Sequence, residues 1–396
     1  MHASSAIEAG SVPVADAAFA TLPPLSLYVH LPWCVRKCPY CDFNSYEARG
    51  EMPERAYVAA LLRDLDAELP LAQGRVLQSV FIGGGTPSLF SGAAIAELLQ
   101  GIAQRLPLAA RAEITLEANP GAIETGRFAE YRAAGVNRLS IGIQSFRDEQ
   151  LTALGRVHDS GEARRGAAAA RAAGFDNLNL DLMYALPGDD VPGAIADLTA
   201  ALELAPEHLS WYQLTLEPNT AFHRRPPALP AEDVVLEIER AGRELIAAHG
   251  YERYEVSAFA RAGRRCRHNL NYWEFGDYLG VGAGAHGKIT RLDTQAVVRR
   301  AKQRNPRTYQ AQAGSARACS EERIERGLVL ECMMNGLRLV EGVTMEDFEA
   351  RTATTREAIA PARAVGVVRG WLVDRADRLQ ATPAGLQMLN RLLELF

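Results

Sequence analysis

The chain has 396 residues, of which 48% are hydrophobic and 23% charged, with a formal net charge of -5 at pH 7. These values are ordinary for a soluble globular protein with one large domain and a smaller one, and the mildly negative charge gives no reason to expect a nucleic-acid partner. No run of 18 apolar residues that could span a membrane occurs, and six cysteines, three of them clustered, indicate a reducing cytoplasmic compartment rather than secretion.

Residues 1–24 contain seven alanines and three prolines but no lysine or arginine. A secretory signal needs a basic start and an apolar core, and this segment has neither. We therefore expect a mobile N-terminal arm that ends before the first strand.

Strands and helices alternate after this arm. Hydrophobic patterning predicts strands near residues 26–30, 80–82, 113–117, 138–143, 177–183 and 208–216, and helices near 52–69, 93–104, 123–134, 161–173 and 192–204. Such alternation requires a parallel sheet with right-handed crossovers. Six strands are too few for a closed eight-stranded barrel, so the predicted fold class is α/β, with a partial (β/α)6 barrel over residues 25–220.

The pattern changes beyond residue 220. We expect a helix over 231–248 and a strand over 251–256, followed by a glycine-dense segment, 280–287, where backbone could approach a ligand closely. Residues 221–315 are assigned to an extension of the barrel. Residues 316–396 are assigned to a smaller, mainly helical C-terminal domain with a short hairpin near 371–380.

This helical end has the element order of a winged-helix DNA binder. From Glu321 onward, however, it carries twelve acidic and ten basic residues. A basic surface would be needed to bind DNA, so a lid or a scaffold is favoured.

Three cysteines lie within eight residues, at Cys34, Cys38 and Cys41, on the loop that leaves the first predicted strand. A structural zinc site usually has two ligand pairs, and no second Cys-x2-Cys occurs here. Three thiolates could hold a [4Fe-4S] cluster and leave one iron open for a cofactor or a substrate. Zinc with His30 or Asp42 as fourth ligand, and buried unligated thiols, are the alternatives.

Polar and glycine-rich residues follow the other predicted strands, at residues 83–86 and 117–119, at Gln144 and at Asp181. The C-terminal ends of parallel strands meet at one edge of a sheet, so these residues can converge with the cysteine loop. For the glycine triplet alone, a tight turn is the alternative.

The spacing Cys34-x3-Cys38-x2-Cys41, with Tyr40 before the third cysteine, resembles the radical S-adenosylmethionine (SAM) superfamily. The resemblance implies that the three cysteines ligate a [4Fe-4S] cluster, whose fourth iron binds the amino and carboxylate groups of SAM. The segment Gly83-Gly84-Gly85-Thr86-Pro87 is similar to the superfamily's glycine-rich segment, which faces the amino group of SAM.

Within the superfamily, the chain from residue 25 onward resembles the oxygen-independent coproporphyrinogen III oxidases (HemN) and the HemW heme chaperones. The matching motifs include residues 28–30, 117–120, 138–146, 154–156 and 181–188. By position in these motifs, the resemblance assigns SAM contacts to Tyr28, Gly84, Gly85, Thr86, Glu117, Gln144, Arg156 and Asp181. Their donors and acceptors suit this ligand. A buried ion pair of Glu117 or Asp181 with Arg138 or Arg156 is the alternative.

Two features of this chain argue against the oxidase branch. The HemN oxidases carry a further cysteine two residues after the third, where this chain has Phe43. The oxidases also have a longer segment before their cysteines, whereas 33 residues precede Cys34 here.

A third feature is His268-Asn269-x-x-Tyr272-Trp273, which resembles the HNxxYW signature of the HemW branch, a signature associated with heme binding. A histidine beside aromatic residues and arginines offers an iron ligand, stacking surfaces and cations for propionates. The alternative is a histidine that caps a turn while Tyr272 and Trp273 pack in a core. His30, His286 and Cys266 are second-line candidates for the iron ligand.

The resemblance therefore implies a cytoplasmic heme chaperone that binds heme, a [4Fe-4S] cluster and SAM. It would pass heme to heme-requiring proteins such as respiratory-chain components, without coproporphyrinogen dehydrogenase activity. The alternative is the oxidase of porphyrin biosynthesis, which decarboxylates two propionates of coproporphyrinogen III through a 5'-deoxyadenosyl radical.

Overall fold

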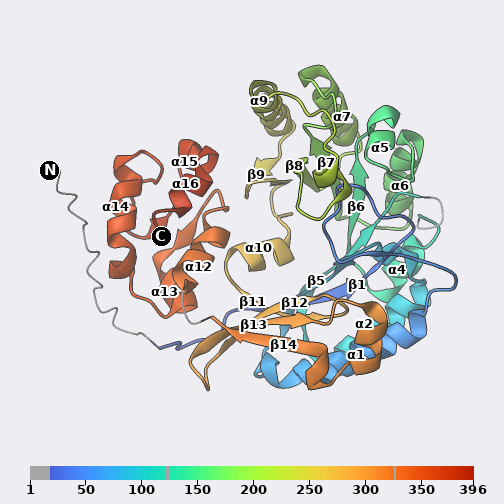
Figure 1. Ribbon diagram of the computed structural model, residues 1–396, viewed down its shortest axis with the longest axis horizontal. Helices are drawn as coiled ribbons and strands as arrows, with labels where there is room; N and C mark the ends of the chain where they lie inside the picture. The colour runs from blue at the N-terminus through green and yellow to red at the C-terminus, as the bar shows by residue number, and fades with distance from the viewer. Residues whose placement is uncertain (1–17, 122–124, 325–326) are drawn as a thin grey trace.

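The structure is a computed structural model, and it describes residues 18–121, 125–324 and 327–396. A 12-stranded sheet forms its centre, in the order β14-β13-β12-β11-β1-β4-β5-β6-β7-β8-β10-β9. The seven strands from β11 to β8 are parallel, and the sheet curves around the short helix α10, Arg267–Trp273 (Figure 1). The fold is thus the predicted open, partial α/β barrel.

The parallel strands are β11 Asp277–Val281, β1 Leu25–Leu31, β4 Leu77–Gly84, β5 Leu108–Ala118, β6 Arg138–Gln144, β7 Leu178–Tyr184 and β8 His208–Gln213. The helices between them are α1 Glu54–Ala72, α2 Gly92–Arg105, α4 Phe128–Ala134, α5 Asp148–Ala153, α6 Ser160–Ala172 and α7 Val191–Glu203. These helices cover the convex face of the sheet (Figure 1). The start of the helix predicted over 123–134 falls on residues 122–124, which lie outside the described part of the chain.

The strand β11 was not predicted, and it changes the count of parallel strands. It follows α10 in the sequence but pairs in parallel with β1, so the parallel part has seven strands instead of six. Helix α5 was also not predicted. The strand expected over 251–256 is reduced to β9, Glu252–Arg253, which pairs with β10, Ala258–Ala260. The helix expected over 231–248 is α9, Glu232–Ala248.

The glycine-dense segment 280–287 contains the turn between β11 and β12, His286–Arg291. A Cβ at Gly282 would lie 2.4 Å from the His30 carbonyl oxygen, and one at Gly280 would lie 2.0 Å from that of His286. These glycines therefore allow protein backbone to pack closely, which differs from the predicted approach to a ligand. Gly284 and Gly287 do line a cavity.

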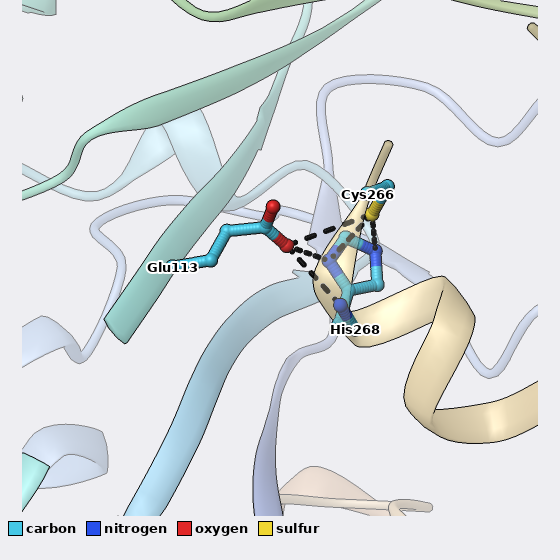
Figure 2. A group of neighbouring side chains, drawn as sticks. All are labelled: Glu113, Cys266 and His268. Atoms are coloured by element: carbon cyan, nitrogen blue, oxygen red, sulfur yellow. Dashed lines mark hydrogen bonds and ion pairs between the residues drawn. The ribbon is translucent and has the colours of Figure 1, made fainter. Parts of the chain in front are cut away.

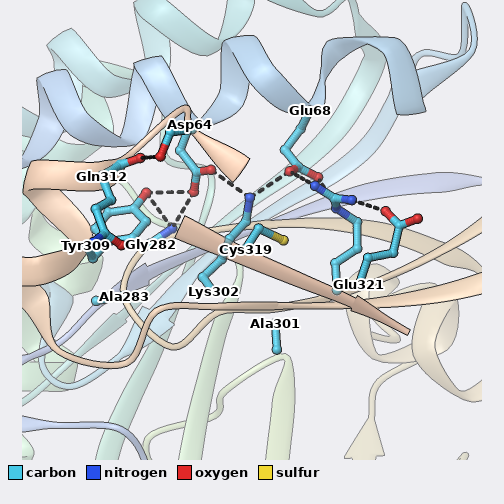
Figure 3. A network of polar contacts seen from close by, with 12 residues as sticks. Asp64, Glu68, Gly282, Ala283, Ala301, Lys302, Tyr309, Gln312, Cys319 and Glu321 are labelled. Atoms are coloured by element: carbon cyan, nitrogen blue, oxygen red, sulfur yellow. Dashed lines mark hydrogen bonds and ion pairs between the residues drawn. The ribbon is translucent and has the colours of Figure 1, made fainter. Parts of the chain in front are cut away.

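Two antiparallel strands extend the sheet beyond β12, namely β13, Ala296–Lys302, and β14, Cys319–Arg323. Residues 316–323 had been assigned to the C-terminal domain, but β14 pairs with β13 in the main sheet. A buried ionic network fastens this extension to α1 (Figure 3). In that network, Lys302 Nζ donates to Asp64 Oδ1 and to Glu68 Oε1, both at 2.6 Å.

The last part of the chain is mainly helical, as predicted. It contains α12 Leu328–Gly336, α13 Met345–Thr352, α14 Ala360–Val368, α15 Pro383–Gln387, α16 Leu389–Leu393 and the strands β15 Val343–Thr344 and β16 Arg378–Leu379. These elements enclose a separate small core, which Phe275, just after α10, joins. They gather on the open side of the curved sheet (Figure 1).

The N-terminal arm was expected over residues 1–24, of which 1–17 lie outside the described residues. Residues next to the first strand contact the sheet. The Phe19 amide donates to Gln295 Oε1 at 2.7 Å, and the Asp277 amide donates to the Pro24 carbonyl at 3.0 Å. Across the described ranges, no helix is long and apolar enough to cross a membrane.

Candidate functional site

A cavity of 380 Å³ lies at the C-terminal ends of the parallel strands, where the strand-end residues were expected to converge. All three clustered cysteines line it. Of the residues assigned to SAM, those that also line it are Gly84, Gly85, Thr86, Glu117, Gln144, Arg156 and Asp181. Tyr28 lines a neighbouring cavity instead. We refer to the 380 Å³ cavity as the cysteine cavity.

The cysteine loop is fixed to the barrel by polar contacts. The Arg156 guanidinium donates to Cys38 Sγ at 3.6 Å, to Asn119 Oδ1 at 2.6 Å and to the Gly142 carbonyl at 2.8 Å. Burial raises the pKa of the thiols of Cys34 and Cys41. These thiols are therefore protonated at neutral pH unless a bound metal centre favours the thiolate.

Two partly buried carboxyl groups, those of Glu117 on β5 and Asp181 on β7, line the cysteine cavity. Glu117 Oε2 accepts a hydrogen bond from the Gly84 amide at 3.1 Å. Asp181 accepts from Ser140 Oγ at 2.9 Å and from Asn179 Nδ2 at 2.8 Å. Within the described part of the chain, neither carboxyl group has an ion-pair partner, so the alternative pairing with Arg138 or Arg156 is not found.

Burial and the neighbouring Asp181 raise the pKa of Glu117 to about 8. A pKa this high means that no cation among the described residues lies close enough to Glu117 to stabilise its carboxylate form. The cavity therefore combines three soft sulfur donors with a pair of acids suited to a cationic ligand.

Gln144 shows local backbone strain at the same edge. Its φ of 70° lies in the left-handed region, and the pairing register of β6 with β7 shifts just before it. The side chain accepts a hydrogen bond from the Tyr212 hydroxyl at 2.9 Å. Strain of this kind in a non-glycine residue is typical of functional sites, and here it turns Gln144 toward the cavity.

The glycine triplet has a structural reason beyond contact with a ligand. A Cβ at Gly84 would lie 2.6 Å from the His30 ring, and one at Gly85 would lie 2.5 Å from the Trp33 carbonyl oxygen. Gly84 also has a φ of +115°. The glycines therefore admit the first strand and the cysteine loop, and both still line the cavity.

His268 lines neither cavity and lies beside Cys266 and Glu113, which is on β5 (Figure 2). Its ring is 6% exposed, stacks on Phe81 at a centroid distance of 4.1 Å and contacts Glu113 Oε1 through Nδ1 at 3.0 Å. Cys266 Sγ lies 3.1 Å from the same nitrogen, and this thiol also lines neither cavity.

Protein groups supply the hydrogen-bond partners and the compensating charge for the cluster of Glu113, Cys266 and His268. Burial by itself would raise the pKa of Glu113, but the hydrogen bond with His268 and the charge of Arg138 hold it well below its ordinary value. The amides of Arg267 and His268 also donate to Glu113. The side chain of His268 is therefore held by protein groups within the fold.

Tyr272 and Trp273, from the same motif, line a second cavity of 820 Å³. We call it the aromatic cavity, because its lining includes Tyr28, Phe81, Tyr272, Trp273, Phe275 and Tyr278. His30 and His286 also line it, and it adjoins the cysteine cavity through shared residues such as Phe43 and Trp273.

Sequence reasoning missed several polar residues of the two cavities. Tyr212 lies on β8, and Arg299 and Arg304 lie on or after β13. Tyr212 had a detectable signal, because it sits near the end of a predicted strand. The two arginines come to the aromatic cavity only through pairing of β12 with β13, which leaves no local signal in the sequence.

Two family profiles and several curated relatives match this chain. The radical SAM superfamily profile matches residues 28–193, and the profile of the HemN C-terminal domain matches residues 327–388. The heme chaperone HemW of Escherichia coli is 50% identical over 375 residues, which cover 95% of this chain and 98% of the relative. The heme chaperone HemW of Mycobacterium tuberculosis is 35% identical, with 91% of this chain and 92% of the relative covered.

Among solved structures, the coproporphyrinogen III oxidase HemN from Escherichia coli, described as a radical SAM enzyme, superposes with a TM-score of 0.78. It is 25% identical to this chain, and the match covers 94% of this chain and 90% of that one.

Proposed function

Because the chain belongs to the HemW family of radical SAM proteins, we propose that it is a heme chaperone that delivers heme to heme-requiring proteins. On this proposal it works in the cytoplasm, and its recipients include components of the respiratory chain. A [4Fe-4S] cluster and SAM are its resident cofactors, and heme is its cargo.

The residues of the cysteine cavity fit the two cofactors. Cys34, Cys38 and Cys41 would hold the cluster, which supplies an open iron and an electron for SAM chemistry when bound. The observation that carries this assignment is the partly buried pair of carboxyl groups, Glu117 and Asp181, which line the same cavity as the three thiols without an ion-pair partner among the described residues. SAM carries a permanent sulfonium charge that would compensate them.

The chain's own residues would orient SAM. Glu117 would accept from the amino group of the ligand, and Arg156 would hold the cysteine loop against Asn119 and Gly142 while its charge favours a nearby carboxylate. Gln144, Gly84, Gly85, Thr86 and Asp181 line the same space. Tyr28 contributes indirectly, since its hydroxyl contacts His30 Nδ1 at 2.7 Å.

For heme, support comes from the family and from the position of Tyr272 and Trp273, which line a cavity next to the cysteine cavity. Flat aromatic side chains can stack on a porphyrin. Phe43 stands at the boundary of the two cavities with 58% of its surface exposed. At this position the oxidases carry a further cysteine, and the comparisons likewise do not favour the oxidase alternative.

One paired experiment tests the proposal. The protein is purified anaerobically with its cluster reconstituted, and it is titrated with heme while a second sample receives coproporphyrinogen III, SAM and a reductant. We expect saturable heme binding and no conversion of coproporphyrinogen III at a catalytic rate. Catalytic conversion without stable heme binding would reject the chaperone in favour of the oxidase.

A further inference from the structure

We propose that the bound heme occupies the aromatic cavity, with His286 as an axial iron ligand and Arg304, assisted by Arg299, as the partner of its propionates. This inference rests on the proposed function, because it takes heme as the cargo. It differs from the role expected for His268 in the HNxxYW motif.

The aromatic cavity has the size and lining that a porphyrin requires. Its volume of 820 Å³ lies within the range of about 300–1,000 Å³ that is common for small-molecule and cofactor sites. Aromatic side chains from β1, β4, α10 and β11 form much of its wall. Its cations come from β12, from β13 and from the segment that follows β13.

The pairing of β12 with β13 directs His286 into this cavity. His286 pairs with Ala301, and Lys288 pairs with Arg299. Since alternate residues of a strand share one face and directly paired residues lie side by side, these four side chains are on the same face of the sheet. All four line the aromatic cavity, and the small Ala301 leaves space beside the imidazole.

The other histidines near the site have their ring nitrogens occupied. His30 contacts the Tyr28 hydroxyl at 2.7 Å and the Asn44 carbonyl at 2.9 Å. His268 is buried against Glu113 and Cys266 and lines neither cavity. His286 is exposed, and among the residues that the structure describes no group is hydrogen-bonded to its ring.

The charge state of His286 also suits iron. Partial desolvation beside the cavity wall and the positive charges of Arg299 and Arg304 lower the pKa of this imidazole, so its neutral form, which has a free lone pair, prevails at pH 7. The phenols of Tyr272 and Tyr278 are poorer ligands, because burial raises the pKa at which they would become phenolates.

The turn that leads into His286 is held firmly. The Gly282 amide donates to the Tyr309 hydroxyl at 2.9 Å, and Asp64 accepts from the same hydroxyl at 2.7 Å (Figure 3). The Ala283 amide donates to the Tyr57 hydroxyl at 2.8 Å. A ligand presented from a rigid element loses little freedom on binding, which favours a defined iron site.

Of the four cations that line the cavity, Arg304 is the one available to a propionate. Lys288 is paired with Asp277 at 3.0 Å, and Lys302 with Asp64 at 2.6 Å. Arg299 is paired with Glu331, but 53% of its side chain is exposed. In the described ranges Arg304 has no ion-pair partner, and its guanidinium makes only a 3.4 Å contact with Asn44 Oδ1.

The test is an anaerobic titration with hemin of the cluster-reconstituted full chain and of three histidine variants, followed by absorption and electron paramagnetic resonance spectroscopy. His286→Ala is expected to lose the imidazole-bound signature and to weaken hemin binding by at least about tenfold. Added imidazole should restore the signature in this variant. The matched control is His249→Ala, which removes an exposed histidine at the end of α9 and should leave both readouts unchanged.

Because His286 is exposed and its side chain forms no hydrogen bond to any residue in the described ranges, His286→Ala should fold, and thermal unfolding followed by circular dichroism checks this. A wild-type spectrum and affinity in His286→Ala would overturn the inference and leave the chaperone proposal intact. Wild-type protein that binds no hemin would reject the proposed function itself. Loss of the signature in His268→Ala, with retention in His286→Ala, would return the ligand to the HNxxYW motif.

A second arm tests the propionate site with hemin and its dimethyl ester. Wild-type protein should prefer free hemin, and Arg304→Gln should remove most of this preference. Arg307→Gln, which changes a nearby exposed arginine outside the aromatic cavity, is the control. An equal preference in Arg304→Gln and wild-type protein would contradict the assignment of the propionates.

Discussion

Binding of SAM should release a proton from Glu117. In the ligand-free protein, burial and Asp181 raise the pKa of this carboxyl group to about 8, so about nine-tenths of the molecules hold the proton at pH 7. The positive charge of the SAM sulfonium near Glu117 would favour the carboxylate. We therefore expect close to one proton to be released from Glu117 per SAM bound at pH 7, and the affinity for SAM to rise as pH approaches 8.

The assay is anaerobic isothermal titration calorimetry of the cluster-reconstituted protein in two buffers of different ionisation enthalpy. Glu117→Gln should lower the proton release by close to one per SAM and weaken SAM binding by about 10- to 100-fold, as expected when a charge-assisted hydrogen bond worth about 1.5–3 kcal/mol is lost. Glu149→Gln, an exposed carboxyl on α5, is the matched control. SAM binding without proton release in wild-type protein, or unchanged release in Glu117→Gln, would refute this reasoning.

The same carboxyl group makes stability depend on pH. Because the folded state binds its proton up to about pH 8 and the unfolded state only up to about 4.5, the ligand-free protein should lose stability as pH rises through this window, and Glu117→Gln should remove that loss in urea titrations. Cys38→Ala should abolish the iron-sulfur absorption near neutral pH, since two thiolates cannot hold the cluster. Lys302→Met leaves the buried Asp64 without its cation and should cost about 3–5 kcal/mol in chemical denaturation, whereas a cost below about 1 kcal/mol would contradict the role of the network. Phe43→Cys should restore the cysteine of the oxidases without producing coproporphyrinogen conversion, and a catalytic rate would show that this one residue separates the two activities.

The alternation of strands and helices could be predicted because hydrophobic periodicity is a local property. The convergence of the strand-end residues, from the cysteine loop to Asp181, could also be predicted. The topology of a parallel sheet places all C-terminal strand ends at one edge. The pairing of β11 with β1 could not be predicted, since it joins segments about 250 residues apart and depends on glycines that admit the His30 backbone.

The motif that includes His268 shows a second limit of prediction from the sequence. Spacing placed His268, Tyr272 and Trp273 together, but α10 directs the histidine toward Glu113 and the two aromatic residues toward the cavity. Which way each side chain points depends on the helix and on its packing inside the curved sheet. For the same reason, His286 was only a second-line candidate, because its direction follows from the β12–β13 register.

The central claim, heme delivery, is tested most directly by a transfer measurement. The heme-loaded protein, with its cluster intact, is mixed anaerobically with a heme-free respiratory cytochrome, and the absorption bands of the two heme complexes are followed over time. We predict that heme moves to the cytochrome in a nearly stoichiometric amount and faster than an excess of apomyoglobin can remove it from the chaperone. Heme that remains on the protein, or that reaches the cytochrome only at the rate of its spontaneous release to apomyoglobin, would contradict the account.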